Sequence, residues 1–484
     1  MYRRNSSIHL VRMTNILLIS LFLCFQNHSL SQNPNPNANL DALIVDEMST
    51  RHFPGASTLI VKNGEIVWVE SYGYADIANS ILAKDTTVFL LASISKLFTG
   101  TAAMQLYQTG TLDIDANINN FLPWPVTIPN FTNDSITARQ LMTHTSSIDD
   151  NWGVMSSYYG YPDPTISLDD CMEDYFSPLG SNYDASLNFL NFAPGSHYKY
   201  SNMGSALNGY LIESSTGIEF DDYCENNLFD VLCMRNTAWH FSDFNPDQVA
   251  MPYSFQNGTF NAIGHYGFAD YPNGQLRSNV MDLANFMIAF LNDGSLNQNS
   301  ILSASNINEM MSLQIPTIDS ITGLNWYKTL LYHSGGQTML WGHNGSEQGV
   351  STYLFIDPQN DIGICLLTNG EGDGLYICDA LYDHALNMTI NNSITPNCNL
   401  SLGLSEIASE KDEIILYPIP AKNFINVEVN TTELKKYKIL SISGKVIISG
   451  SLSGPKARIE LPILPSGLYI FQIEDKLPQL MQIN

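Results

Sequence analysis

The sequence of 484 residues has few basic side chains and no cluster of metal ligands. Between residues 13 and 410 there are nine Lys or Arg residues against forty Asp or Glu residues. Because such an acidic surface repels a phosphate backbone, we do not expect nucleic acid as a partner. The seven cysteines include no Cys-x-x-Cys pair and no His/Cys cluster at zinc spacing, so we predict no metal site and no cofactor.

Long apolar runs are missing as well. The run from Ile16 to Phe25 has ten residues, about half of the ~20 that a membrane-spanning helix needs. It follows three arginines in the first 12 residues and precedes small residues at 29–31, a pattern typical of a cleaved export signal. We therefore predict a signal peptide over residues 1–31. Lipidation of Cys24 is the alternative, although bulky Leu23 precedes it where a small residue is expected.

The remaining composition is that of a globular protein with a large core, and the length predicts two to three domains. Six cysteines remain after removal of the signal. Export permits disulfides, but the sequence does not give their pairing, and buried free thiols are the alternative.

Periodicity predicts strands at both ends of the main body and helices between them. The apolar runs 56–61 and 66–72 flank an Asn-Gly turn, which predicts a β-hairpin, and further strands are expected at 349–356 and 362–368. Helices are expected near 39–48, 93–110, 137–144, 280–292 and 375–388. This order favours an α+β fold, an antiparallel sheet flanked by helices with a helical subdomain, in which the first and last strands pair.

The C-terminal part differs from the body. Residues 393–411 lack periodicity and are predicted to be a linker. Six short strand-like runs follow within 412–484, separated by turns, and this spacing predicts a small β-sandwich.

The first motif with chemical content is Ser93-Ile94-Ser95-Lys96, at the expected start of a helix. Side chains three residues apart share one helix face, so the Ser93 hydroxyl and the Lys96 amine can meet. A serine hydroxyl becomes a nucleophile when a base takes its proton, and a lysine whose pKa is lowered by burial can be that base. Alone, this spacing is common by chance.

Two downstream segments add to it: Tyr200-Ser201-Asn202 and Gly342-His343-Asn344-Gly345-Ser346. With these three motifs in this order, the chain resembles the serine β-lactamase and penicillin-binding protein superfamily, particularly its class C-like branch. That family uses Ser-x-x-Lys, Tyr-x-Asn and Lys/His-x-Gly in the same order. The resemblance covers roughly residues 39–392, and we place the hydrolase domain at 32–392. Ser147 and Gln275 stand where the family has glycines.

The resemblance implies a role for each motif residue. Ser93 would form an acyl-enzyme, Lys96 would relay its proton, and Tyr200 would be a second acid/base, acting as a phenolate or through a proton shared with Lys96. Asn202 would bind the substrate and orient Lys96. The Ser346 backbone, with the amide of Ser93, would form the oxyanion hole, and Gly345 would let the acyl group approach the strand. His144 is interpreted as a buried structural histidine.

His343 bears on the substrate. Where carboxylate recognition dominates, the family generally has lysine here, whereas histidine is mostly neutral at pH 7. We therefore expect esterase, amidase or D-aminopeptidase activity on a small-molecule or peptide-like substrate rather than strong β-lactamase or carboxypeptidase activity. The pocket walls are expected from residues 145–190 and 240–275. The alternative is a binding protein that keeps the fold without turnover.

The tail carries a second resemblance. Ile415-Leu416-Tyr417-Pro418-Ile419-Pro420 and the segment Leu464-Pro465-Ser466-Gly467-Leu468-Tyr469 resemble the C-terminal sorting domain of the Bacteroidetes type IX secretion system, with Ile419 in place of the usual asparagine. The resemblance implies export through the periplasm, secretion machinery as a partner, and a final location that is secreted or attached to the cell surface.

Overall fold

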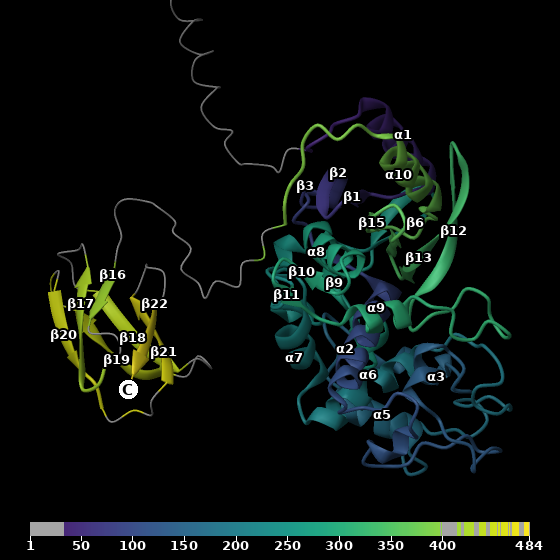
Figure 1. The fold of residues 1–484 in the computed structure, drawn as a ribbon, viewed down its shortest axis with the longest axis horizontal. Coiled ribbons are helices and arrows are strands. Elements are labelled where there is room, and N and C mark those ends of the chain that lie inside the picture. The colour runs from purple at the N-terminus through teal and green to yellow at the C-terminus, as the bar shows by residue number, and fades with distance from the viewer. Residues whose placement is uncertain are drawn as a thin grey trace, which may run out of the picture. The chain divides into compact units, whose positions relative to one another are not determined.

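The computed structural model describes residues 33–396 and 398 and, in the C-terminal part, residues 414–417, 421–429, 435–441, 446–452, 454, 456–462, 464, 467–473 and 479–483. The chain divides into two compact units, one within residues 1–400 and the other within 401–484 (Figure 1). The predicted signal peptide over 1–31, together with residues 397 and 399–411 of the predicted linker, lies outside the described residues.

A seven-stranded antiparallel sheet forms the centre of the first unit. Its order is β12 (Tyr327–His333), β13 (Gly336–Glu347), β14 (Val350–Asp357), β15 (Ile362–Thr368), β1 (Gly55–Lys62), β2 (Glu65–Asp76) and β3 (Ile81–Leu82). The predicted hairpin is β1 paired with β2, turning at Asn63 and Gly64, which both have positive φ. The expected pairing of the first and last strands is confirmed, because β1 and β15 are neighbours with Leu59 opposite Cys365. Sequence reasoning did not identify β12.

Helices cover both faces of this sheet, as the α+β prediction requires. On one face, α1 (Ala38–Arg51) and α10 (Leu375–Asn387) lie side by side, and Ile44 and Leu381 pack with Ile60 and Phe355 of the strands (Figure 1). On the other face, α8 (Val280–Leu291) packs against β1 and β15. Residues that alternate along a strand therefore enter different cores, which is why β15 is buried along its whole length.

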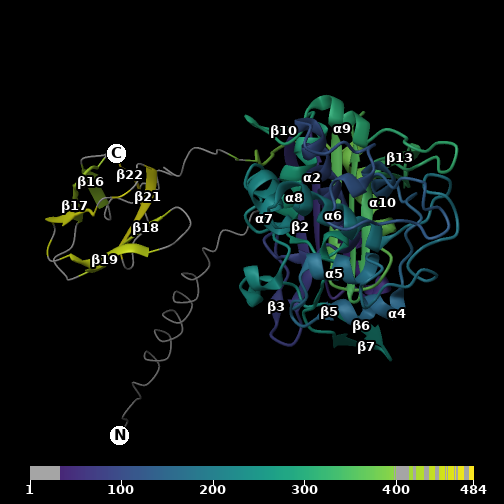
Figure 2. The same cartoon turned by 90° about the horizontal axis from the view of Figure 1, so that it is seen from below.

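The helical subdomain extends from the α8 face. It contains α2 (Ser95–Thr109) and α6 (Asn202–Thr216), packed together, with α3 (Ala138–Met142) and α5 (Leu168–Phe176) against α6 (Figures 1 and 2). Helix α2 ends at Gly110, where φ is 75°, as the sequence predicted. The short remaining elements of this unit are α4 (Trp152–Met155), α7 (Phe220–Cys224), α9 (Ala304–Met310), β4 (Phe89–Leu90) with β9 (Arg277–Ser278), β5 (Tyr159–Gly160) with β8 (Gly267–Phe268), β6 (Tyr253–Gln256) with β7 (Thr259–Ala262), and β10 (Ser295–Leu296) with β11 (Asn299–Ser300).

A disulfide bond holds the end of the first unit to the rest of that unit. Cys233 and Cys398 form a disulfide across a sequence separation of 165 residues, and Ile394 exchanges backbone hydrogen bonds with Ile66. The first residues of the predicted linker are thus held against the first unit. The other four described cysteines are buried free thiols, so both alternatives left open by the sequence occur.

The second unit has two small antiparallel sheets. One contains β16 (Ile414–Tyr417), β17 (Phe424–Val429) and β20 (Lys456–Glu460); the other contains β19 (Val446–Leu452), β18 (Lys435–Ser441), β21 (Gly467–Ile473) and β22 (Gln479–Ile483). Side chains from both sheets, among them Ile425 and Phe471, share one apolar core. The predicted six strands are present, and β22 is a seventh that the sequence analysis did not identify.

Candidate active site

Ser93 lies in a tight turn at the start of α2. A short 3₁₀ helix over Ala92–Ile94 precedes the α-helix, and Ala92 has a φ of 49°, which is rare for a residue with a side chain. Neighbouring segments hold this turn: Thr352 Oγ1 donates to the Leu91 carbonyl at 2.7 Å, and Ser95 Oγ donates to the Ala92 carbonyl at 2.6 Å. The strained conformation thus presents the Ser93 side chain to a cavity, as is frequent for residues at functional sites.

Lys96 lies behind this hydroxyl and is completely buried. Its Nζ is 3.2 Å from Ser93 Oγ, 2.8 Å from Asn202 Oδ1 and 2.6 Å from the carbonyl oxygen of Asn273. Burial lowers the pKa of Lys96 to about 7, although the negative charges of Asp150, Asp270 and Glu347 act in the opposite direction. The amine is therefore neutral in a large share of molecules at pH 7, the form in which it can accept a proton.

Asn202 is held in place by Asp150, a residue that the sequence analysis did not identify. The Asp150 carboxylate accepts the Asn202 backbone N–H at 3.0 Å and Nδ2 at 2.8 Å, and also accepts the backbone N–H of Met203 at 3.0 Å. These N–H groups begin α6, where a carboxylate is favoured by the unpaired donors and by the helix dipole. Asp150 thereby fixes the amide so that its oxygen faces Lys96.

Tyr200 lies beside both groups. Its ring centroid is 4.9 Å from Lys96 Nζ, its side chain interacts with that of Ser93, and the His144 ring lies 4.3 Å away. Burial raises the pKa of Tyr200 well above its ordinary value of 10, so the phenol is protonated at neutral pH. The phenolate alternative considered from the sequence is therefore disfavoured, and Lys96 is the better base. His144 is buried, and burial lowers its pKa well below 6.5.

Residues 343–347 of β13 have a strand partner on one side only. Strand β12 pairs with β13 no further than Gly342, whereas β14 pairs along the segment. On the free side, the Asn344 N–H donates to the Tyr327 hydroxyl at 3.0 Å. Because alternate residues of an antiparallel strand direct their N–H groups to the same side, the Ser346 N–H also points to this free edge. That is where the oxyanion donor is expected.

The structure bears on the expected roles of Gly345 and His343 in this strand: Gly345 departs from its expected role, whereas His343 is neutral, as expected. Gly345 does not line the cavity; a Cβ there would overlap with the Leu91 carbonyl oxygen and Thr352 Oγ1, so the glycine permits contact between β13 and the turn that holds Ser93. His343 lines the cavity but is 2% exposed, and burial lowers its pKa to about 3. Its Nδ1 lies 2.6 Å from the Asn344 carbonyl, so the neutral ring donates from Nδ1.

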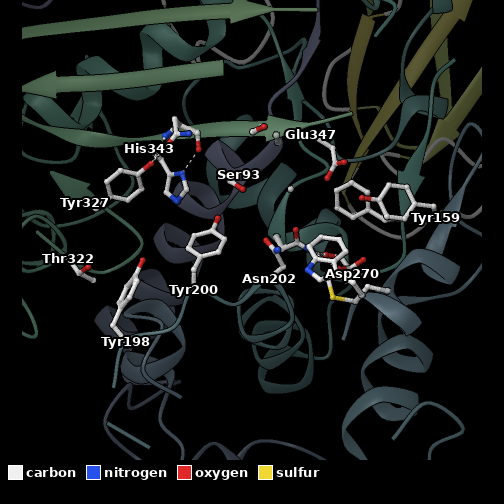
Figure 3. A pocket seen from close by; sticks show the side chains of 18 of the residues that line it. Ser93, Tyr159, Tyr198, Tyr200, Asn202, Asp270, Thr322, Tyr327, His343 and Glu347 are labelled. Atoms are coloured by element: carbon white, nitrogen blue, oxygen red, sulfur yellow. Dashed lines mark hydrogen bonds between the residues drawn. The ribbon is translucent and has the colours of Figure 1, made fainter. Parts of the chain in front are cut away.

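Figure 3 shows the cavity in front of Ser93. It has a volume of about 430 Å³, and its lining includes Ser93, Tyr200, Asn202, His343 and Ser346, whereas Lys96 lies behind it. The expected wall segments contribute Trp152 to Tyr159 and Phe268 to Gly274; a third segment, 321–327, was not expected. The described residues contain no group of three or more His, Cys, Asp or Glu side chains that could hold a metal ion.

The two departures from the family's glycines have structural explanations. Ser147 has a φ of 62°, a conformation that glycine adopts more readily. Gln275 is fully buried; its Oε1 accepts the Phe268 backbone N–H at 2.5 Å and its Nε2 donates to the Trp239 carbonyl at 3.0 Å. The glutamine side chain thus links the cavity wall at Phe268 to the backbone of Trp239.

Comparison with known protein families agrees with this geometry. The Beta-lactamase family profile matches residues 40–386, most of the chain. The chain belongs to the β-lactamase family. This is a family of serine hydrolases, and the resemblance seen in the sequence is confirmed. Residues 415–482 match the secretion system C-terminal sorting domain, which indicates secretion or a cell-surface location for this β-lactamase-family protein and interaction with the secretion machinery.

Individual relatives are distant. Protein flp of Staphylococcus aureus is 26% identical over 331 residues, which are 68% of this chain and 62% of that protein, so the match spans less than two thirds of the relative. The octameric penicillin-binding protein homologue from Pyrococcus abyssi has a TM-score of 0.58 at 20% identity and covers 92% of this chain and 99% of its own. The D-amino acid amidase from Ochrobactrum anthropi SV3 has a TM-score of 0.57 at 22% identity and covers 72% of this chain and 99% of its own. These two structures show the shared fold.

No helix among the described residues is both long and apolar enough to cross a membrane.

Proposed function

We propose that this protein is a secreted serine hydrolase that cleaves an ester or amide through an acyl-enzyme on Ser93. One observation carries the proposal: a fully buried lysine amine, with its pKa lowered to about 7, lies 3.2 Å from the hydroxyl of a serine that opens into a cavity. An ordinary structural lysine does not have this environment, because burying an ammonium ion without a carboxylate partner is costly.

The reaction follows from the contacts. Neutral Lys96 accepts the Ser93 proton as Oγ attacks the substrate carbonyl, whose developing negative charge is stabilised by the backbone N–H groups of Ser93 and Ser346. The proton then passes to the leaving alcohol or amine, directly or through the Tyr200 hydroxyl, as the carbonyl–heteroatom bond breaks. Water hydrolyses the acyl-enzyme by the same proton path, giving a carboxylic acid and free Ser93.

The neutral state of His343 supports esters and amides over carboxylate-bearing substrates. Among the residues that the structure describes, no lysine or arginine lines the cavity, and the His343 ring is uncharged at pH 7 because its pKa is about 3. A β-lactam or a peptide C-terminus brings a carboxylate that finds no permanent cation here. The amidases among the proteins of similar fold agree with this preference.

The test is labelling of the purified protein with a fluorophosphonate, together with hydrolysis of p-nitrophenyl acetate. We expect one adduct on Ser93, located by mass spectrometry, and a loss of hydrolysis of at least about 10³-fold in Ser93→Ala. The control Ser157→Ala removes an exposed hydroxyl near the cavity and is expected to keep full activity. If neither an adduct nor ester hydrolysis is found, the protein is a binding protein with this fold.

A further inference from the structure

The two sides of the cavity differ in charge (Figure 3). On one side of Ser93 lie His343, Tyr327 and Tyr198, all uncharged at neutral pH; on the other side lie Glu347 and Asp270. Within the part of the chain that the structure describes, neither carboxylate forms an ion pair, and no lysine or arginine lines the cavity. A negative charge therefore faces the substrate on one side only.

Glu347 lies where its carboxylate can contact a bound substrate. It is the last residue of β13, directly after Ser346, whose N–H we assigned to the oxyanion hole. One of its oxygens accepts the Gln348 backbone N–H at 2.9 Å, and the Tyr159 side chain interacts with the carboxyl group, so the side chain is positioned before any ligand arrives. Half-buried in the cavity lining, it remains accessible to a substrate group.

Aromatic rings complete this side. Tyr159 and Phe268 both line the cavity, with ring centroids 5.3 Å apart, and the buried Tyr266 ring lies 5.9 Å from Tyr159. The pairing of β5 with β8 brings these residues together, opposite each other in register. A carboxylate beside aromatic faces is a combination that binds an ammonium ion, through charge and cation–π attraction.

Asp270 plays a lesser part. It is 3% exposed, its Oδ2 accepts Asn273 Nδ2 at 2.7 Å, and Asn273 in turn accepts Lys96 through its carbonyl. Burial raises the pKa of Asp270 to about 7, so it is partly protonated at neutral pH. Glu347 is the more accessible of the two carboxylates.

We propose that Glu347, Tyr159 and Phe268 form a subsite for a positively charged amino group in the acyl part of the substrate, which makes aminoacyl esters and amides with a free amino group the preferred substrate class. The proposal rests on the proposed function. The scissile carbonyl must lie at Ser93 Oγ with its oxygen toward the Ser346 N–H, and Glu347 is the adjoining residue of the strand, so the amino group lies within a few bonds of that carbonyl.

The first experiment compares substrates on the wild-type protein. Aminoacyl p-nitroanilides of both configurations with a free amino group are set against their N-acetyl counterparts, with p-nitrophenyl acetate as a substrate that has no amino group. We expect kcat/KM to be at least about tenfold higher for one free-amino configuration than for its N-acetyl form, since a hydrogen-bonded charge in such a site contributes a factor of this size. Phenethylammonium should inhibit p-nitrophenyl acetate hydrolysis competitively, and phenylacetate should not.

The second experiment uses Glu347→Gln. We expect kcat/KM for the free-amino substrate to fall by about 10–100-fold, while that for p-nitrophenyl acetate changes by less than about threefold. The matched control is Glu371→Gln, which removes the same charge from an exposed side chain that contacts the nearby Gly349 N–H but does not line the cavity. It should leave both values unchanged.

Two results would overturn this subsite: equal kcat/KM for free-amino and N-acetyl substrates in the wild type, or an equal loss for all substrates in Glu347→Gln. Either result leaves the serine hydrolase intact, provided p-nitrophenyl acetate is cleaved. Failure of the hydrolase itself would instead show as no cleavage of any substrate and no adduct on Ser93, so the two failures are distinct.

Discussion

Behind Ser93, the fully buried Lys96 and the half-buried Asn202 and Asp150 are joined in a chain of contacts, whereas in front of Ser93 polar groups line an open cavity. Lys96 meets Asn202 and the Asn273 carbonyl, and Asp150 holds Asn202 in turn. In the cavity, by contrast, Glu347 forms no ion pair with any described residue, and His343 is neutral. Under the proposed function, the difference separates two tasks: the closed side sets the proton affinity of Lys96, and the open side selects the substrate.

Among the changes that test this comparison, the largest effect is expected from breaking the closed side at Asp150. Asp150→Asn replaces an acceptor of several N–H donors by an amide with one oxygen, so Asn202 and Lys96 lose their alignment. We expect kcat/KM to fall by about 100-fold for every substrate alike, because small displacements of catalytic groups have effects of this size. Asp149→Asn, whose carboxylate accepts the Asp150 backbone N–H, is the neighbouring control and should lose less than about threefold.

A thermal melt of Asp150→Asn separates positioning from unfolding. If the variant is folded but its loss of kcat/KM differs between substrates, Asp150 acts in substrate recognition. That result would contradict the division between the closed and the open side. The variant should also move the acid limb of the pH profile to lower pH, because the Asp150 charge raises the pKa of Lys96.

A smaller effect is expected from changing the open side at His343. His343→Lys adds a cation opposite Glu347, so carboxylate-bearing substrates gain a partner. We expect the ratio of nitrocefin to p-nitrophenyl acetate hydrolysis to rise by about tenfold, the range of one hydrogen bond to a charged group. His343→Gln, which stays neutral, should leave the ratio unchanged; a similar rise with glutamine would show that size rather than charge restricts nitrocefin.

The smallest effect tests the electrostatic link between the two sides. In the wild type, kcat/KM for p-nitrophenyl acetate should fall as pH drops through about 7, because Lys96 then gains a proton and can no longer act as a base. Asp270 titrates in the same range, so the limb reports both groups. The Glu347 charge raises the pKa of both Lys96 and Asp270. Glu347→Gln should therefore move the acid limb of the kcat/KM profile to lower pH by a fraction of a unit. A shift of the acid limb to higher pH in Glu347→Gln would contradict this link. The control Glu371→Gln should leave the acid limb where it is.

The sequence predicted the fold and the closeness of Ser93 to Lys96 because both follow from local patterns, whereas the other motif residues were named from the family resemblance. The hairpin at residues 55–76 and the antiparallel sheet follow from apolar periodicity and an Asn-Gly turn, and Ser93 and Lys96 are close because they lie on one helical turn. Strand β12 was missed because it lies at the edge of the sheet, half-exposed, with only Leu331 fully buried in it.

The supporting residues were not predictable in the same way. Asp150 reaches Asn202 across 52 positions of sequence, and the Asn273 carbonyl reaches Lys96 across 177. These contacts arise from tertiary packing of loops and carry no periodic signal. The charge of the cavity depends on Glu347 lacking a cation partner, which a sequence without coordinates does not reveal.

The disulfide between Cys233 and Cys398 has a consequence for a protein that is secreted with a sorting unit at its C-terminus. It anchors the end of the first unit just before the chain continues toward the second. Tension applied through the sorting unit during transport would be borne by a covalent bond to Cys233 rather than by the hydrogen bonds of the central sheet. A protease that cuts beyond Cys398 would likewise release the tail and leave the end of the first unit bonded to Cys233.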